Sequence, residues 1–576
     1  MVSRTQLTAL MGVLVLLIIV ACGGDATATP ASIFPTATAA PTATSVPTAT
    51  IPPTPSSPLL RLNLGGEPST LDPQLASSLL EFSVLRQLSE GLLGFDKDLH
   101  LIPLVAAEVP TVQNGGISED GLIYTFKLRK GLIWSDGQPL TAGDFVYTFK
   151  RILSPDIAGP YASFFSVIEG GEDYLMAGDA NKTTKDSLRE AVGISAISDD
   201  TLVINLAAPN PTFLQKIALV AGFPVRKDVI EEFGTEWTEA GNYVGNGPYI
   251  LSEWAHQDHI TLESNPTYWG PAPKQPRVRL GMITDVNAEL IAFKAGDLDI
   301  ARVPPGTEAV ILGDDTLSVQ VLRSSQLSSL ALFLNTTIEP LNDPLVRKAI
   351  ATGIDRNSWT EKVKNGVGEP ATGWLPPGIP GFDPMVGNEY QFNAEKAQEL
   401  LDEAGFPGGE GFPEITLTYV DAGDQGLMAQ FLQVQLSGNL GIDLALDPLD
   451  PSSYGGQVIG GRQFEITLLA WTADYPDSEN FLASLFSAES FLNITGYAND
   501  EFDRLAGLAA TELDQETRVA LWSQAHEVMI ADAPIVPFIY IERYYLKSPS
   551  VHGLVLTGID GEIPGDTKLA EVSLSP

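Results

Sequence analysis

Three carboxylates and three large aromatic side chains lie within the twelve residues 470–481, "AWTADYPDSENF". The acids are Asp474, Asp477 and Glu479. Such a group could be a catalytic carboxylate pair, a metal-binding loop or an anchor for a positively charged ligand. Alternatively, Asp474 could cap a short helix near 480–486, because aspartate is common in turns and at helix starts. We interpret Asp477 and Glu479 as solvated turn acids.

Motifs that would support catalysis are incomplete. The sequence has no Gly-x-Ser-x-Gly elbow, no phosphate-binding Gly-x-x-x-x-Gly-Lys loop and no Cys-x-x-Cys pair. His526 begins "HEVMI", where isoleucine replaces the second histidine of a zinc helix. His256 and His259 lie around a turn with no third ligand nearby, which favours an exposed polar turn over a metal site. We therefore expect no enzyme, no metal site and no cofactor.

The composition limits the possible partners. The 576 residues include 33 Lys and Arg and 72 Asp and Glu, which gives a formal net charge of −39. This charge repels phosphate backbones, so we expect no nucleic-acid partner. The length allows two or three domains. Because Cys22 is the only cysteine, the chain can form neither an internal disulfide nor a cysteine-based metal site.

The N-terminus has the features of an export signal. Arg4 precedes the apolar run 7–21, which has the length of a signal-peptide core, so residues 1–21 are predicted to be a signal peptide. The run ends in "IVACG", which resembles a bacterial lipobox and implies cleavage before Cys22 and lipid on its thiol. The alternative is an ordinary signal peptide with an incidental cysteine.

Residues 22–58 would then be the lipidated cysteine and a linker rich in Pro, Thr and Ala, which cannot bury enough apolar surface to fold. The predicted location is the outer face of the cell membrane, with the lipid as anchor. No later run is long and apolar enough to cross a bilayer.

From Leu59 onward, short helical and extended patterns alternate. Apolar residues recur at helical spacing within 80–96, and 123–128 alternates like a strand. Thr141 and Asp144 form a capping-box pattern before a helix over 142–153. Further elements are predicted as a hairpin over 244–269, strands over 328–337, 414–420, 464–471 and 535–546, and helices over 393–405, 428–441 and 516–533. The mixture without a fixed repeat favours α/β or α+β domains.

Several blocks in a fixed order carry a family resemblance. They include "GEPSTLDP", "LSEGLLGFD", "YTFKLRKGLIWSDGQPLTAGDFVYTFKRI", "NGPYILSEW", "DPLVRKAIATGIDR", "AWTADYPDSENFL" and "APIVPFIYIERYYL", and the matches run from about 59 to about 556. Through these blocks the chain resembles the bacterial extracellular solute-binding proteins of the oligopeptide and dipeptide ABC-transporter class, solute-binding protein family 5.

The resemblance implies an α/β, two-lobed periplasmic-binding-protein-like fold (type II, Venus-flytrap) with an additional third domain. The implied domains are lobe I over 59–90, 209–325 and 534–576, the extra domain over 91–208, and lobe II over 326–533. It also implies capture of a peptide or another small polar ligand by hinge closure and its delivery to the permease of an ABC importer. We expect the protein to act as a monomer.

The resemblance also implies ligand-binding residues. Asp474 would bind the α-ammonium group of a peptide beside Trp471, although an aromatic that ends an apolar strand is usually a core residue. The backbone of Ser77, Ser78 and Leu79 would pair with the extended ligand, and Tyr161 would lie over it.

One departure leaves the ligand class open. Peptide binders of the family can carry a base shortly before the Trp of the "AWTADY" block, but residues 467–470 contain none and the nearest is Arg462. A binder of oligosaccharide or nickel-chelate in the same family therefore stays an alternative. So do a sensory or adhesive surface lipoprotein without a transporter, and a hydrolase without a known motif.

Overall fold

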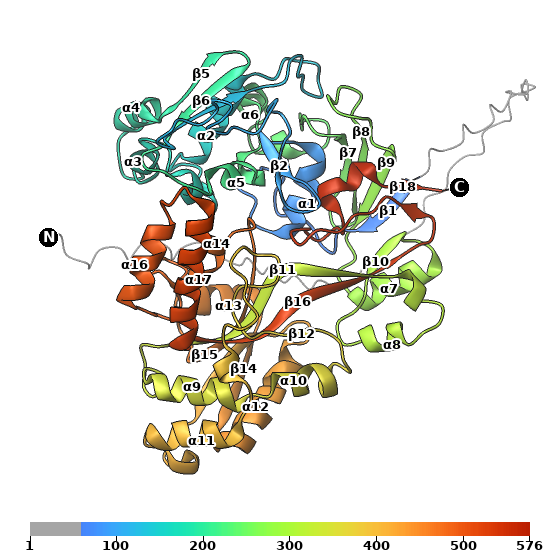
Figure 1. The fold of residues 1–576 in the computed structure, drawn as a ribbon. Helices are drawn as coiled ribbons and strands as arrows, with labels where there is room; N and C mark the ends of the chain where they lie inside the picture. Colours follow the sequence, from blue (N-terminus) through green and yellow to red (C-terminus); the bar gives the residue numbers. More distant parts are fainter. Residues whose placement is uncertain (1–58, 576) are drawn as a thin grey trace, which may run out of the picture. The chain divides into compact units, whose positions relative to one another are not determined.

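Two long strands run through the centre of the molecule (Figure 1). In the computed structural model, which describes residues 59–575, β11 (Val321–Leu334) pairs antiparallel with β16 (Ile535–Lys547). Their pairing is interrupted between Ser325 and Ser329, and such irregularities bend a strand. On one side of the interruption β16 contributes Tyr545 to one hydrophobic core, and on the other β11 contributes its apolar residues to a second core. The two strands therefore connect two separately packed regions.

The second of these cores lies on the largest sheet. The strand order is β10-β16-β11-β15-β13-β14, with β12 paired to β16. The further strands are β10 (Ile300–Arg302), β12 (Glu369–Pro370), β13 (Ile415–Val420), β14 (Leu444–Leu449) and β15 (Ile466–Thr472). β13 is parallel to β14 and β15, whereas β10, β11, β12 and β15 pair antiparallel with their partners in the centre. Because β15 ends at Thr472, Asp474 lies just beyond the C-terminal end of this strand.

Long helices cover this sheet, and three of them confirm the helices predicted over 393–405, 428–441 and 516–533. They are α9 (Pro344–Gly353), α11 (Ala394–Glu403), α12 (Gln425–Leu440), α16 (Asp500–Ala509) and α17 (Gln515–Ala531). α9, α11 and α12 pack on one another, and α16 pairs with α17 (Figure 1). Their inward residues, such as Leu401, Leu436 and Trp522, join the same hydrophobic core as β11. Burial of these apolar faces is the main source of stability for such helices.

A second sheet contains the first described strand of the chain. Its order is β1-β9-β8-β7, with β1 (Leu59–Asn63) parallel to β9 (Arg277–Gly281). β7 (Tyr249–Ala255) and β8 (His259–Ser264) form the predicted hairpin. The helix α1 (Leu79–Leu88) contributes Val84, Leu85 and Leu88 to the core of this sheet. More than two hundred residues therefore separate β1 from its partner, so this part of the fold is assembled from distant segments.

The predicted helix within 80–96 is shorter in the structure. α1 ends at Leu88, and β2 (Leu93–Phe95) follows and pairs with β3 (Leu101–Pro103). The chain turns away because Ser89 is extended and because Asn246 holds the backbone of Glu90 on both sides, accepting from its N–H and donating to its carbonyl. Tertiary contacts thus override the helical periodicity here.

A third sheet has its own hydrophobic core. It consists of β4 (Ile123–Lys127), β6 (Thr201–Asn205) and β5 (Ile194–Ser198), paired in that order. The helix α2 (Ala142–Ile152) packs Phe145 and Phe149 against it. α2 begins with the predicted capping box, in which the N–H of Thr141 donates to Asp144 at 2.7 Å.

Shorter elements complete the fold. The helices are α3 (Gly171–Leu175), α4 (Lys182–Ala191), α5 (Phe213–Ile217), α6 (Lys227–Phe233), α7 (Val286–Ala295), α8 (Glu308–Leu312), α10 (Arg356–Ser358), α13 (Pro451–Tyr454), α14 (Ser478–Phe481) and α15 (Ala483–Phe486). The remaining strands are β17 (Val551–His552) and β18 (Ser573–Leu574). Within 59–575, none of the helices combines the length and apolar character that a membrane crossing requires.

The three sheets and their separate cores agree with the predicted mixed α/β organisation. The exact boundaries of the predicted lobes and of the extra domain stay a prediction. The predicted signal peptide, Cys22 and the linker to residue 58 lie outside the described residues.

Candidate ligand-binding site

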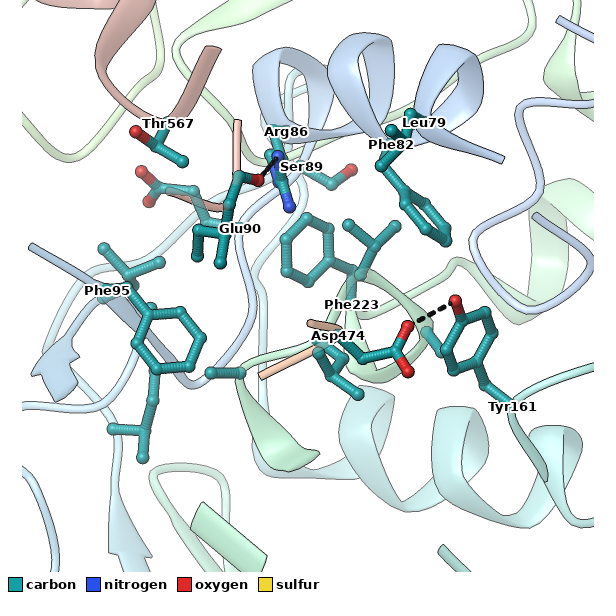
Figure 2. Close-up of a pocket in the computed structure, with 18 of the residues that line it drawn as sticks. Leu79, Phe82, Arg86, Ser89, Glu90, Phe95, Tyr161, Phe223, Asp474 and Thr567 are labelled. Carbon is teal, nitrogen blue, oxygen red and sulfur yellow. Dashed lines mark hydrogen bonds between the residues drawn. The ribbon is translucent and has the colours of Figure 1, made fainter. Parts of the chain in front are cut away.

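Asp474 lies at the edge of an internal cavity, immediately after β15 (Figure 2). Its Oδ1 accepts the hydroxyl hydrogen of Tyr161 at 2.9 Å, and its Oδ2 accepts from the side-chain amide of Asn480 at 3.0 Å. The Asp474 residue is half-buried: it borders the cavity, and protein atoms are packed densely around its carboxylate. This burial raises the pKa of Asp474 above its ordinary value, and the two hydrogen bonds only partly oppose the rise.

No cation within 59–575 forms an ion pair with Asp474. Its partners are a neutral phenol and a neutral amide, each of which donates one hydrogen bond. Because an enclosed carboxylate gains most from a cationic donor, the geometry leaves this group ready for a positively charged ligand atom.

Tyr161 comes from the region of the third sheet, immediately before a short 3-10 turn at Ala162–Phe165. Its ring packs edge-on against Phe82, with 5.7 Å between centroids, and against Phe164 at 5.4 Å. Burial and then the charge of Asp474 raise the pKa of the Tyr161 phenol, so it is a proton donor at neutral pH. Tyr161 and Asp474, two of the predicted site residues, are therefore in direct contact at the cavity.

Trp471 does not line the cavity. Its indole N–H donates to Oδ1 of Asn480 at 3.1 Å, and the same oxygen accepts the backbone N–H of Asp474 at 3.0 Å. Trp471 is partly buried against the core of the largest sheet. It thus positions Asn480, which in turn orients the Asp474 carboxylate. Sequence reasoning missed Asn480, because no local pattern marks an asparagine that bonds six residues back.

Ser77 and Leu79 line the cavity, and Ser78 is the N-cap of α1. The backbone N–H groups of Ser77 and Ser78 both donate to Oε2 of Glu81, at 2.7 and 2.9 Å. In this structure those two amides are therefore occupied and do not offer the free donors that strand addition requires. The spacing Ser78-x-x-Glu81 is a capping-box pattern, so the sequence did contain this signal.

The cavity encloses about 220 Å³ and is bordered by segments from across the chain. Besides the residues above, its lining includes Phe82, Arg86, Glu90, Phe95, Leu219, Phe223, Ile559 and Lys568. Figure 2 shows Phe82 and Arg86 below α1, with Phe82 nearer to Tyr161 and Asp474 and with Arg86 nearer to Glu90.

Two of the other charged groups of the lining, Arg86 and Glu90, are engaged with protein partners. Arg86 is paired with Asp566 at 3.0 Å. Glu90 accepts hydrogen bonds from the Tyr268 hydroxyl at 2.6 Å and the Trp269 indole at 2.7 Å. Burial raises the pKa of Glu90, and the nearby charge of Lys568 acts in the opposite direction.

The interpretation of Asp477 and Glu479 as solvated turn acids was wrong. Asp477 is 1% exposed, caps α14 and forms two 2.6 Å hydrogen bonds with Arg518. Glu479 accepts from Lys216 at 2.8 Å and from Thr212 at 2.6 Å. Burial alone would raise the pKa of Glu479, but Lys216 lowers it overall. These two acids are buried in the folded protein because Arg518 and Lys216, which are distant in the sequence, supply the opposite charges.

The histidines that were tested as metal ligands have structural partners. His526 is fully buried, and its Nε2 accepts the backbone N–H of Trp374 at 2.9 Å. Burial lowers the pKa of His526 to about 3, so its ring is neutral. His256 contacts Glu67 and Glu239, and His259 contacts Asp258 and Glu253.

The cavity is thus lined from three regions of the chain. Ser77 and Leu79 precede or begin α1, Tyr161 comes from the region of the third sheet, and Asp474 follows a strand of the largest sheet. A ligand held here would bridge all three.

Comparisons with known proteins identify the family of the chain. The model of the bacterial extracellular solute-binding proteins, family 5 (middle region) matches residues 70–493. The dipeptide-binding protein DppE of Bacillus subtilis (strain 168) is 31% identical over 504 residues, which cover 86% of this chain and 89% of DppE.

Solved structures show the same likeness. The murein tripeptide-binding protein MppA of Escherichia coli superposes with a TM-score of 0.75 and 29% identity, over 90% of this chain and 99% of MppA. Haemophilus influenzae OppA in complex with the peptide RPPGFSPFR has a TM-score of 0.71 and 27% identity, over 90% and 99% of the two chains. The likeness establishes the predicted two-lobed fold with a third domain. The family consists of binding proteins and not of enzymes. The chain belongs to the bacterial extracellular solute-binding proteins of family 5.

Proposed function

We propose that this protein captures peptides outside the cytoplasm and is the substrate-binding component of an ABC importer. The observation that carries the proposal is the Asp474 carboxylate, which is enclosed by protein, is held by Tyr161 and Asn480, and lacks a cationic partner within 59–575. The α-ammonium group of a peptide would supply that cation. It is present in every unmodified peptide, so the anchor would recognise peptides as a class.

The positions of the lining residues support capture by hinge closure. A peptide in the cavity would contact the α1 region, Tyr161 and Asp474 together, and would stabilise the arrangement in which these segments approach one another. A ligand shifts such an equilibrium by the difference between its affinities for the two states. The interruption between β11 and β16 is a place where the connecting strands can bend.

Relatives support the ligand class. DppE is named for dipeptides, MppA for a murein tripeptide, and OppA was solved with a bound peptide. We further propose that lipid on Cys22 and the linker to residue 58 tether the binding domain near its permease. Tethering raises the effective concentration of loaded protein at the membrane.

The proposal is tested by ligand retention. The purified protein is incubated with a mixed peptide library, washed and analysed by mass spectrometry. We expect enrichment of peptides with free amino termini, whereas the same library acetylated at its amino termini is not retained. Retention of oligosaccharide or a nickel complex instead would reject peptide capture. Equal retention of acetylated peptides would reject the Asp474 anchor.

A further inference from the structure

The wall of the cavity next to Asp474 is apolar. Leu79 and Phe82 of α1, together with Leu219 and Phe223 from the segment after α5, line it. Figure 2 shows Leu79, Phe82 and Phe223 on the side of the cavity where Asp474 and Tyr161 meet. A ligand group placed against this wall would lose its contact with water without gaining a hydrogen-bond partner there.

The charged side chains that line other parts of the cavity leave the wall next to Asp474 apolar. Arg86 is paired with Asp566 and also donates to the carbonyl of Ile559 at 3.2 Å. Glu90 is held by Tyr268 and Trp269, and Lys568 offsets part of its charge. Among the described lining residues, Asp474 is the charged group without an opposing charge nearby. A second charge on the ligand that is placed against the apolar wall would have no partner there and would be costly to desolvate.

The size of the cavity restricts which part of a ligand enters it. At about 220 Å³ it is smaller than the roughly 300–1,000 Å³ of pockets that enclose drug-sized ligands. It therefore suits one end of a ligand. In a peptide, the first side chain branches from the same carbon that bears the ammonium group. Once the ammonium contacts Asp474, the adjoining apolar wall receives that side chain.

We propose that this protein selects peptides whose first residue has a bulky apolar side chain. This inference rests on the proposed peptide capture and adds a specificity to it. The ammonium anchor supplies class recognition, and the wall of Leu79, Phe82, Leu219 and Phe223 supplies discrimination among peptides. A ligand end that carries an ammonium group next to an apolar side chain matches Asp474 and the apolar wall beside it.

Calorimetric titration of the purified protein with peptide pools tests the inference. The pools are of mixed length and identical composition except at the first residue, which is Leu, Phe, Gly, Asp or Lys. We expect the Leu and Phe pools to bind about tenfold to a hundredfold more tightly than the Gly pool, from the burial of apolar surface. The Asp and Lys pools are expected to bind more weakly than the Gly pool, because the second charge is unpaired.

A matched pair of variants tests whether the apolar wall is responsible for the preference among first residues. Leu219→Ser should weaken binding of the Leu pool about threefold to tenfold and leave the Gly pool unchanged. Leu446→Ser, at a half-buried leucine of β14 outside the cavity, should change neither. If Leu219→Ser does not fold, the titration of the unmodified protein with the five peptide pools still tests the inference.

Three outcomes are distinguishable. A preference for Leu and Phe supports the inference. Equal affinity of all pools, or a preference for Asp or Lys, overturns the inference and leaves peptide capture intact. Failure of every pool to bind overturns peptide capture, and the inference with it.

Discussion

The hydroxyl of Tyr161 donates a hydrogen bond to Asp474 across 313 residues of sequence. The bond joins the region of the third sheet to the end of a strand in the largest sheet. Both residues line the cavity, and Tyr161 lies beside the proposed ammonium anchor (Figure 2). In the absence of a ligand, this phenol supplies one of the two side-chain donors that the enclosed carboxylate has. Tyr161 thus joins two regions of the fold and partly opposes the rise of the Asp474 pKa.

Removal of that hydroxyl is expected to weaken peptide binding moderately. Tyr161→Phe keeps the ring contacts with Phe82 and Phe164 and deletes a hydrogen bond to a charged group, which is worth about 1.5–3 kcal/mol. Under the proposed hinge closure this bond forms as the segments close around a peptide, so its loss lowers affinity. Because the peptide ammonium also contacts Asp474, we expect a drop at the lower end of that range. Titration calorimetry measures it. An unchanged affinity would show that Tyr161 does not help to hold Asp474 in the bound state.

Replacement of the anchor is expected to be more severe. Asp474→Asn keeps the size of the side chain and removes its charge, so peptide affinity should fall by about 2 kcal/mol or more, on the order of thirtyfold. The melting temperature without peptide should not fall, because an enclosed carboxylate without a cation costs stability. Asp421→Asn, at an exposed acid after β13, is the matched control and should leave affinity unchanged. Wild-type affinity in Asp474→Asn would remove the basis of the anchor.

The raised pKa of Asp474 predicts a pH dependence of stability. The folded state holds the proton of this carboxyl more tightly than the unfolded chain, so its contribution is unfavourable above the folded pKa. The penalty shrinks as the pH falls through that pKa, and it is absent below the unfolded value of about 3.9. The difference in the free energy of unfolding between the wild type and Asp474→Asn should therefore narrow on acidification. Urea unfolding without peptide at a series of pH values measures it, and a difference independent of pH would contradict the shift.

The ion pair between Lys216 and Glu479 is expected to stabilise the folded state. The two side chains are 6% and 16% exposed, and they join α5 to α14 at 2.8 Å. Lys216→Met leaves Glu479 with only Thr212 and the 3.5 Å contact to Arg518, so we expect a loss of about 3 kcal/mol in the free energy of unfolding.

The double variant Lys216→Met/Glu479→Gln should lose less free energy of unfolding than the sum of the losses in the two single variants. In the double variant, neither position 216 nor position 479 carries a charge that lacks its partner. Lys182→Met, which breaks an exposed pair with Asp186, is the control and should change stability by less than about 1 kcal/mol. Additive effects at Lys216 and Glu479 would mean that the pair is not coupled.

The proposed lipid attachment at Cys22 predicts the location of the protein. Cys22→Ser should move the protein from the membrane fraction to the soluble exported fraction, because no thiol remains for the lipid. Fractionation and immunoblotting of cells that express each form measure this. Ser3→Ala, a change of equal size outside the lipobox pattern, should stay with the membrane. Membrane association of Cys22→Ser equal to that of the wild type would reject the anchor.

Local patterns in the sequence predicted much of the secondary structure. The capping box at Thr141 and Asp144, the hairpin of β7 and β8, and the helices α11, α12 and α17 all follow from caps, turns and apolar spacing. These features depend on residues a few positions apart, so a single sequence contains them. The ordered blocks also identified the family, and through it the two-lobed fold.

The tertiary structure decided the roles of individual residues in "AWTADYPDSENF". By itself, the sequence determined that three acids follow a buried strand, and it named Asp474 as the candidate anchor. Only the fold showed that Arg518 neutralises Asp477 and that Lys216 neutralises Glu479, which leaves Asp474 with neutral donors. The charge state of a carboxylate depends on which cation comes within a few ångströms. That proximity is set by long-range packing and not by neighbours along the chain.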